Sequence, residues 1–232
     1  MGLRRVPFAP AEWYHCYNRG VEGRKVFLNN KDYERFVESL YLSNDQDHTH
    51  RYNIKHRKHS EILTSSRGEP LVAIGAYCLM PNHFHILLKE LAEKGISKFM
   101  HRAVTGYAMY FNIKHKHVGG LFVRPFRAKH ISNDRYLRRV AEYIHLNPVE
   151  LFERSWKLGR VNDLRQLNLR LNEYPHSSLP SFVNDRLEKV VLDSDAIELL
   201  RGNGAIAKTS DLLEERSVYY ASLNPQGVAL GI

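Results

Sequence analysis

A short run at residues 80–88, Met-Pro-Asn-His-Phe-His-Ile-Leu-Leu, alternates like a β-strand and carries two histidines separated by one bulky apolar residue. Successive side chains of a strand point to opposite faces, so His83 and His85 share one face and the alternate apolar residues share the other. The apolar face predicts one wall of a core. Two imidazoles at positions i and i+2 can supply half of a divalent-metal site, although two solvated histidines are the plainer interpretation of this pattern alone.

A second pattern lies at residues 141–149, Ala-Glu-Tyr-Ile-His-Leu-Asn-Pro-Val. Apolar residues at helical spacing lead into it and predict an amphipathic helix, which Pro148 should end at or just before Asn147. Tyr143 and Asn147 are four residues apart, so they share one face of that helix. Taken singly, they are typical of a half-buried helix tyrosine and a helix terminator.

The wider order of patterns is β-α-β-β-α-β-α. It predicts an α+β fold, a ferredoxin-like or RRM-like antiparallel sheet with helices on one face, plus a small helical C-terminal appendage. We expect a main domain over residues 1–180 and the appendage over residues 181–232. A polar stretch rich in histidine, lysine and arginine at about residues 45–70 interrupts the pattern. It predicts a basic insertion, either a loop or an extended hairpin.

The charge balance fits a polyanionic partner. Lysine and arginine number 34 against 25 aspartate and glutamate residues, a net charge of +9, which favours nucleic acid through counterion release but also occurs in other proteins. The two cysteines, Cys16 and Cys78, lack zinc-site spacing and argue against a disulfide framework. Because no apolar segment follows the basic N-terminal residues and no run approaches a membrane span, we predict a cytoplasmic protein.

In this order, the histidine and tyrosine patterns resemble the single-tyrosine HUH transposases. The REP-associated branch is the most similar, because its proteins often read Met-Pro-Asn-His-x-His and Tyr-Ile-x-x-Asn-Pro-Val. A third block matches at residues 14–20, Tyr-His-Cys-Tyr-Asn-Arg-Gly, followed by a helix near Lys31. The resemblance spans about residues 10–180. Near its end His176 and Leu179 replace aromatic residues of a family element, which weakens any stacking role there.

The site that this resemblance implies carries out DNA transesterification. Tyr143 would attack the scissile phosphate of single-stranded DNA, giving a 5′-phosphotyrosine intermediate and a free 3′-hydroxyl. His83, His85 and Asn147 would hold a divalent cation, Mg²⁺ or Mn²⁺, with Asn147 binding through its amide oxygen. The natural target would be hairpin-containing DNA of the REP type, bound by a monomer or a homodimer. Candidate DNA contacts are the polar or basic residues Asn18, Arg19, Arg24, Lys25, Arg124, Arg127 and Lys129.

Two other classes of function stay open. An RRM-like basic sheet could bind RNA or single-stranded DNA without chemistry, although such stacking platforms carry aromatic residues where this strand has His83 and His85. A metal-dependent nuclease would use the same metal with water and form no covalent tyrosine link. A covalent adduct between the protein and labelled DNA that is lost in Tyr143→Phe separates the three.

Overall fold

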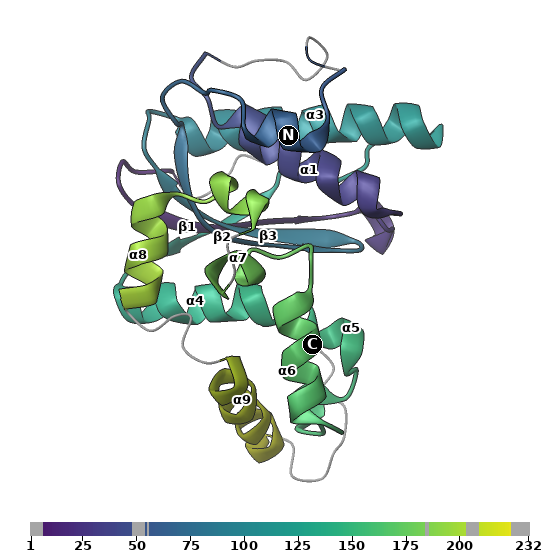
Figure 1. Cartoon of the computed structure of the whole chain (residues 1–232), viewed down its shortest axis with the longest axis vertical. Helices are drawn as coiled ribbons and strands as arrows, with labels where there is room; N and C mark the ends of the chain where they lie inside the picture. The colour runs from purple at the N-terminus through teal and green to yellow at the C-terminus, as the bar shows by residue number, and fades with distance from the viewer. Residues whose placement is uncertain (1–6, 48–53, 55, 184–185, 203–208, 224–232) are drawn as a thin grey trace.

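The computed structural model describes residues 7–47, 54, 56–183, 186–202 and 209–223. Its central element is a four-stranded antiparallel sheet in the order β2-β3-β1-β4 (Figure 1). Helices α1 and α3 connect the strands in β-α-β-β-α-β order, which is the ferredoxin-like arrangement. The predicted α+β class and antiparallel sheet are therefore confirmed. The bounds are β1 (Trp13–Arg19), α1 (Asn30–Ser43), β2 (Val72–Met80), β3 (His83–Glu90), α3 (Gly95–His115) and β4 (Arg127–Ile131).

One face of the sheet forms the main core with α1 and α3, which lie together above the strands in Figure 1. The alternating apolar residues of β3 point into this core, and Phe84, Ile86 and Leu88 are fully buried. The ring of Phe84 meets that of Phe36 from α1, with centroids 4.9 Å apart. The prediction that alternate residues of this run form one wall of a core is confirmed.

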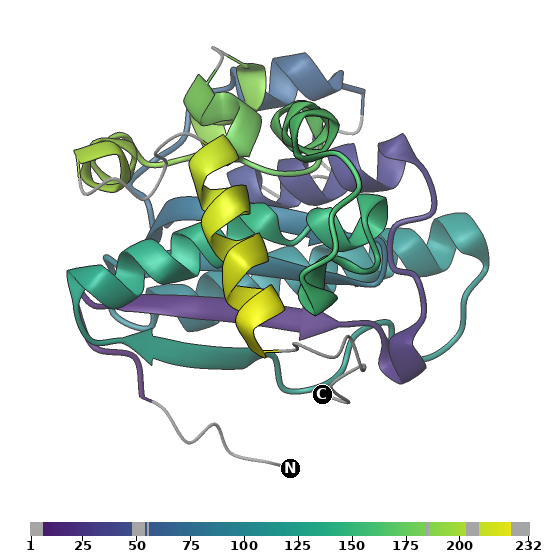
Figure 2. The ribbon, with the colours of Figure 1, turned by 90° about the horizontal axis from the view of Figure 1, so that it is seen from below.

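Helix α4 (Asp134–Leu146) lies across the opposite face of the sheet (Figure 1 and Figure 2). The side chain of Asn133 caps its N-terminus by accepting the backbone N–H of Tyr136 at 2.9 Å, and Pro148 follows its last turn. All nine residues of β2 are buried, because helices cover both faces of the sheet there. The helices expected on one face are present, and α4 adds a layer on the other.

The predicted insertion at residues 45–70 is closed at its base by Asn44, the residue that follows α1. The buried side-chain oxygen of Asn44 accepts the backbone N–H groups of Leu71 and Val72, each at 2.9 Å. Its amide nitrogen donates to the carbonyl of Val72 at 2.8 Å. These three bonds join the end of α1 to the start of β2.

The described part of the insertion corrects the prediction of a loop or extended hairpin. It contains helix α2 (His59–Leu63), and Ile62 and Leu63 of this helix are buried in the main core. The pair of apolar residues was the sequence signal for this contact. Residues 48–53 and 55 of the predicted insertion lie outside the described residues.

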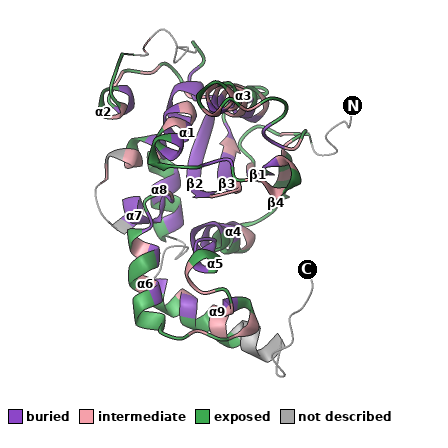
Figure 3. Cartoon of the chain, turned by 90° about the vertical axis from the view of Figure 1, so that its right-hand side faces the viewer, coloured by how far each residue is buried: buried purple, intermediate pink, exposed green. Residues whose placement is uncertain are grey.

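After α4 the described chain is largely helical, as predicted for the C-terminal appendage. Leucines from α6 and α9 pack with Leu146 and Trp156 in a second, smaller core, while α8 packs against β2. Figure 3 shows α6 as mostly exposed, whereas the described part of α9 mixes exposed, intermediate and buried residues. The domain boundary at residue 180 stays a prediction. These elements are α5 (Val149–Phe152), η3 (Trp156–Leu158), α6 (Leu164–Glu173), α7 (Leu179–Val183), η4 (Leu187–Val191), α8 (Ser194–Gly202) and α9 (Thr209–Leu223).

Within the described ranges, no helix combines the length and the apolar character that crossing a membrane requires.

Candidate active site

Strand β3 places His83 and His85 side by side on the sheet face toward α4, with ring centroids 5.0 Å apart. His85 is buried and His83 is half-buried. The period of two in the strand thus has the effect expected from the sequence, because the intervening apolar residues lie in the core on the other side.

The orientation of His83 is set by two asparagines. Its Nδ1 lies 2.7 Å from Oδ1 of Asn82, and because an amide oxygen only accepts, Nδ1 of His83 must carry the proton. The side chain of Asn147 also contacts His83, while the Asn147 amide nitrogen donates to the Tyr143 carbonyl at 2.8 Å. With these bonds made, Nε2 of His83 and Oδ1 of Asn147 each keep a lone pair.

His15 of β1 orients the imidazole of His85. Its Nε2 lies 2.8 Å from Nδ1 of His85, so one nitrogen donates and the other accepts, and Nε2 of His85 is left for another partner. Burial, and secondarily Lys129, lowers the pKa of His15 to about 4. Burial also lowers the pKa of His85 well below its usual value, with His15 and His83 adding to the effect. Both rings are neutral at pH 7, the form that binds metals.

His15 was not among the predicted site residues, although it belongs to the N-terminal block of the resemblance. His15 and Tyr17 alternate on β1 as His83 and His85 do on β3, and that alternation was the available signal. What no single strand shows is the register, which pairs Tyr17 with His85 across the sheet.

Tyr143 projects from α4 toward these histidines. Its ring centroid is 5.4 Å from that of His85 and 5.8 Å from that of His15, and 48% of the residue is exposed. Asn147 follows one turn later at the end of the same helix. Tyr136, by contrast, lies two turns earlier, where the amino group of Lys129 approaches its ring centroid at 5.3 Å.

A buried polar contact fixes α4 relative to the sheet. Nε2 of His145 lies 2.8 Å from the hydroxyl of Ser178, and that hydroxyl also accepts the backbone N–H of Tyr77 in β2 at 2.8 Å. Next to this contact, the ring of His176 stacks on Tyr33 with centroids 3.6 Å apart. The half-buried imidazole of His176 thus stacks on a tyrosine of α1.

Two cavities flank the site. The first, which we call the β1-end cavity, has a volume of about 350 Å³ and is lined by Tyr17, Asn18, Arg19, Asn82, His83, Val123 and Arg127. The second, the α4-side cavity, has a volume of about 120 Å³ and is lined by Tyr143, Leu146, Asn147, Glu150, Trp156, Lys157 and Arg216. Arg216, which α9 brings to within 3.3 Å of Glu142, had no signal in the sequence patterns.

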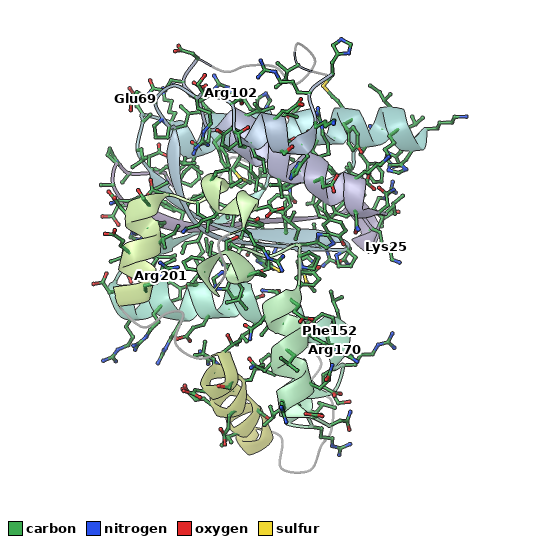
Figure 4. All side chains as sticks on the ribbon, viewed as in Figure 1. Lys25, Glu69, Arg102, Phe152, Arg170 and Arg201 are labelled. Carbon is green, nitrogen blue, oxygen red and sulfur yellow. The ribbon has the colours of Figure 1, made fainter. Side chains whose placement is uncertain are left out.

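The seven predicted DNA contacts fall into three groups. Asn18, Arg19 and Arg127 line the β1-end cavity, although Asn18 is buried and accepts the backbone N–H of Arg19 at 2.9 Å. Lys129 is exposed on β4 beside His15. The third group is Arg24, Arg124 and Lys25. Arg24 pairs with Glu22 at 3.6 Å, and Arg124 is exposed before β4. Lys25 lies at the end of the sheet far from Arg201 of α8 (Figure 4). The structure does not bring this last group to the histidines.

A model of a known protein family matches part of the chain. The family model described as "Transposase IS200 like" matches residues 50–147, which include the two histidines of β3 together with Tyr143 and Asn147. This match confirms the resemblance to transposases and supports a transposase-like function in DNA processing. No curated protein matches.

One solved structure is similar in outline. It is described as "Structure of the REP associates tyrosine transposase bound to a REP hairpin" and is 15% identical, with a TM-score of 0.47. The alignment covers 84% of this chain and 93% of that one.

Proposed function

We propose that the protein is a divalent-metal-dependent transesterase that cleaves and rejoins single-stranded DNA through a 5′-phosphotyrosine on Tyr143. The observation that carries the proposal is the convergence of three elements: His83 and His85 from β3, His15 from β1, and Tyr143 with Asn147 from α4. The family match supports the general class of reaction.

The donor set fits a divalent cation. Nε2 of His83 and Oδ1 of Asn147 each offer a lone pair to a cation, and Nε2 of His85 offers a third in the tautomer whose Nδ1–H donates to Nε2 of His15. Each imidazole has its Nδ1 occupied by a neighbour, an arrangement typical of metal-binding histidines because it fixes the tautomer and the ring orientation. Two imidazoles and an amide suit Mn²⁺ at least as well as Mg²⁺. When bound, the cation would offset the negative charge that builds up on the scissile phosphate.

The tyrosine performs the covalent step. Oη of Tyr143 forms a bond to phosphorus while the bond from phosphorus to the 3′-oxygen breaks, and the phosphate stays on the tyrosine as a diester. The phenolic proton passes to water, which reaches this half-exposed side chain, and the leaving 3′-oxygen takes a proton from water. Rejoining reverses the two bonds and needs no ATP, because the phosphotyrosine keeps the energy of the original ester.

The substrate in this proposal is single-stranded DNA beside a hairpin of the REP type. An unpaired strand exposes its backbone to the site beside α4 and the sheet, and the basic residues Arg19, Arg127 and Lys129 border that site. Because α4 covers part of the sheet face, bases cannot stack along the whole sheet as they do on an RRM-like binding platform.

A denaturing gel tests the proposal. Wild-type protein, a hairpin-containing single strand labelled at its 3′ end and Mn²⁺ should give a slow-migrating covalent adduct. Tyr143→Phe removes the hydroxyl and little else, so the adduct should disappear while DNA binding persists. Tyr136→Phe, on the same helix, is the matched control and should keep the adduct. Cleavage without an adduct would show a nuclease, and binding without cleavage would show a non-catalytic binding protein.

A further inference from the structure

The β1-end cavity is a preformed pocket beside His83. Its frame is held by backbone hydrogen bonds: Gly20 donates to the carbonyl of Asn82 at 2.8 Å, and Val123 donates to the carbonyl of Arg19 at 3.0 Å. These bonds connect the end of β1 to the turn before β3 and to the segment before β4. A pocket of about 350 Å³ is in the range of small-ligand sites.

The lining of this cavity has the chemistry of a nucleotide site. Tyr17 presents an aromatic ring, which is only partly buried and lies nearly parallel to His85 at a centroid distance of 5.6 Å. Arg19 and Arg127 are exposed residues of its lining, and none of the described residues that line it is acidic. An aromatic face and two guanidinium groups favour a base joined to a phosphate, since stacking holds the base and paired N–H donors hold the oxygens.

The position of the β1-end cavity relative to Tyr143 determines which nucleotide of the DNA the cavity binds. His83 borders the β1-end cavity and Tyr143 does not, whereas Tyr143 borders the α4-side cavity and neither His83 nor His85 does. In phosphoryl transfer the attacking and leaving oxygens lie roughly in line on opposite sides of phosphorus. With Oη of Tyr143 on the α4 side, the leaving 3′-oxygen lies on the side of the β1-end cavity.

We propose that the β1-end cavity is the subsite for the nucleotide immediately 5′ of the scissile phosphate, the one that departs with the free 3′-hydroxyl. Tyr17 stacks on its base, and Arg19 and Arg127 hold the phosphate on its 5′ side. This inference rests on the proposed transesterase function. It explains how the 3′-hydroxyl end stays in place for rejoining, because its base and phosphate are bound independently of the broken bond.

The test compares abasic DNA in wild-type protein and in two variants of Tyr17. The probe is a single-stranded oligonucleotide with a hairpin and a flank, selected from a randomised pool by adduct formation with wild-type protein, and its cleavage position is mapped. The nucleotide 5′ of that position is then replaced by an abasic residue. Single-turnover cleavage by wild-type protein should slow by about 5- to 150-fold, the range for loss of one stacked base.

In Tyr17→Leu, which keeps bulk beside His85 but has no aromatic face, the abasic substitution should cause little further slowing. In Tyr17→Phe the abasic substitution should slow cleavage as much as it does in wild-type protein. An abasic residue on the 3′ side of the cut is the matched control, with an equal effect in all three proteins. Because each protein is compared with itself on two substrates, a general loss of activity in a variant does not affect the ratio.

If the abasic residue on the 5′ side slows cleavage equally in wild-type protein and in Tyr17→Leu, the subsite assignment is wrong, while the transesterase function is unaffected. If no member of the pool forms an adduct, the proposed function fails and the subsite fails with it.

Discussion

Asn44 provides a sharp test of the hydrogen bonding that closes the base of the insertion. Its side chain makes three buried bonds, at 2.9, 2.9 and 2.8 Å, to the backbone of Leu71 and Val72, and both of these residues are almost fully buried. Asn44→Ala removes all three bonds. At about 1 kcal/mol for each bond, the free energy of unfolding should fall by about 3 kcal/mol. For a chain of this size that corresponds to a melting temperature lower by roughly 6–12 °C.

Asn44→Asp is the matched variant, because it keeps the size of the side chain and both accepting bonds. It replaces the donor toward the Val72 carbonyl with an anionic oxygen, so we expect it to destabilise the protein at pH 7. When the new carboxyl takes up a proton, it can donate to that carbonyl. The two backbone N–H groups of Leu71 and Val72 favour the ionised form, but we expect burial and the facing carbonyl to outweigh them and to raise the pKa in the folded state above the unfolded value of about 3.9.

The sign of the pH dependence follows from that difference. The folded variant binds more protons than the unfolded chain, so its stability relative to wild type should rise as pH falls from 7 toward 4, by at most about 1.4 kcal/mol per pH unit. Urea unfolding at several pH values measures it. A loss below about 1 kcal/mol for Asn44→Ala, or a gap between Asn44→Asp and wild type that does not change with pH, would refute the reasoning.

Three further outcomes follow from other parts of the molecule. His83→Ala or His85→Ala should abolish cleavage and leave hairpin binding largely intact in a gel-shift assay; cleavage near the wild-type rate would exclude them as ligands. Deleting residues 47–58 should weaken DNA binding and reduce its salt dependence, read from binding titrations at several salt concentrations, whereas an unchanged salt slope would contradict this role. Ile62→Ala should lower the free energy of unfolding by about 2–5 kcal/mol, and a near-neutral result in urea unfolding would show that α2 packs loosely.

The local patterns of the sequence predicted the elements that carry the site. The period of two placed His83 and His85 on one face of β3, and the helical period with Pro148 predicted a helix that the structure has at Asp134–Leu146. Both predictions rest on interactions within one element, which are encoded in adjacent residues.

Contacts between elements were beyond the reach of these patterns. The bond between His15 and His85 depends on the register of β1 against β3, which neither strand specifies alone. Arg216 lies 74 residues after Glu142 in the sequence, so its position beside Glu142 depends on the path of the whole intervening chain. The helix α2 was missed because its apolar pair lies among polar residues, and a pair is too short to show a period.

The inner position of β1 limits how this chain can be divided. β1 is hydrogen-bonded to β3 along one edge and to β4 along the other, while the family match starts only at residue 50. A fragment limited to the matched stretch would lack the strand between its own β3 and β4, together with His15 and Tyr17. Residues 50–147 therefore do not contain a complete site, and a fragment or fusion protein must include β1 as well.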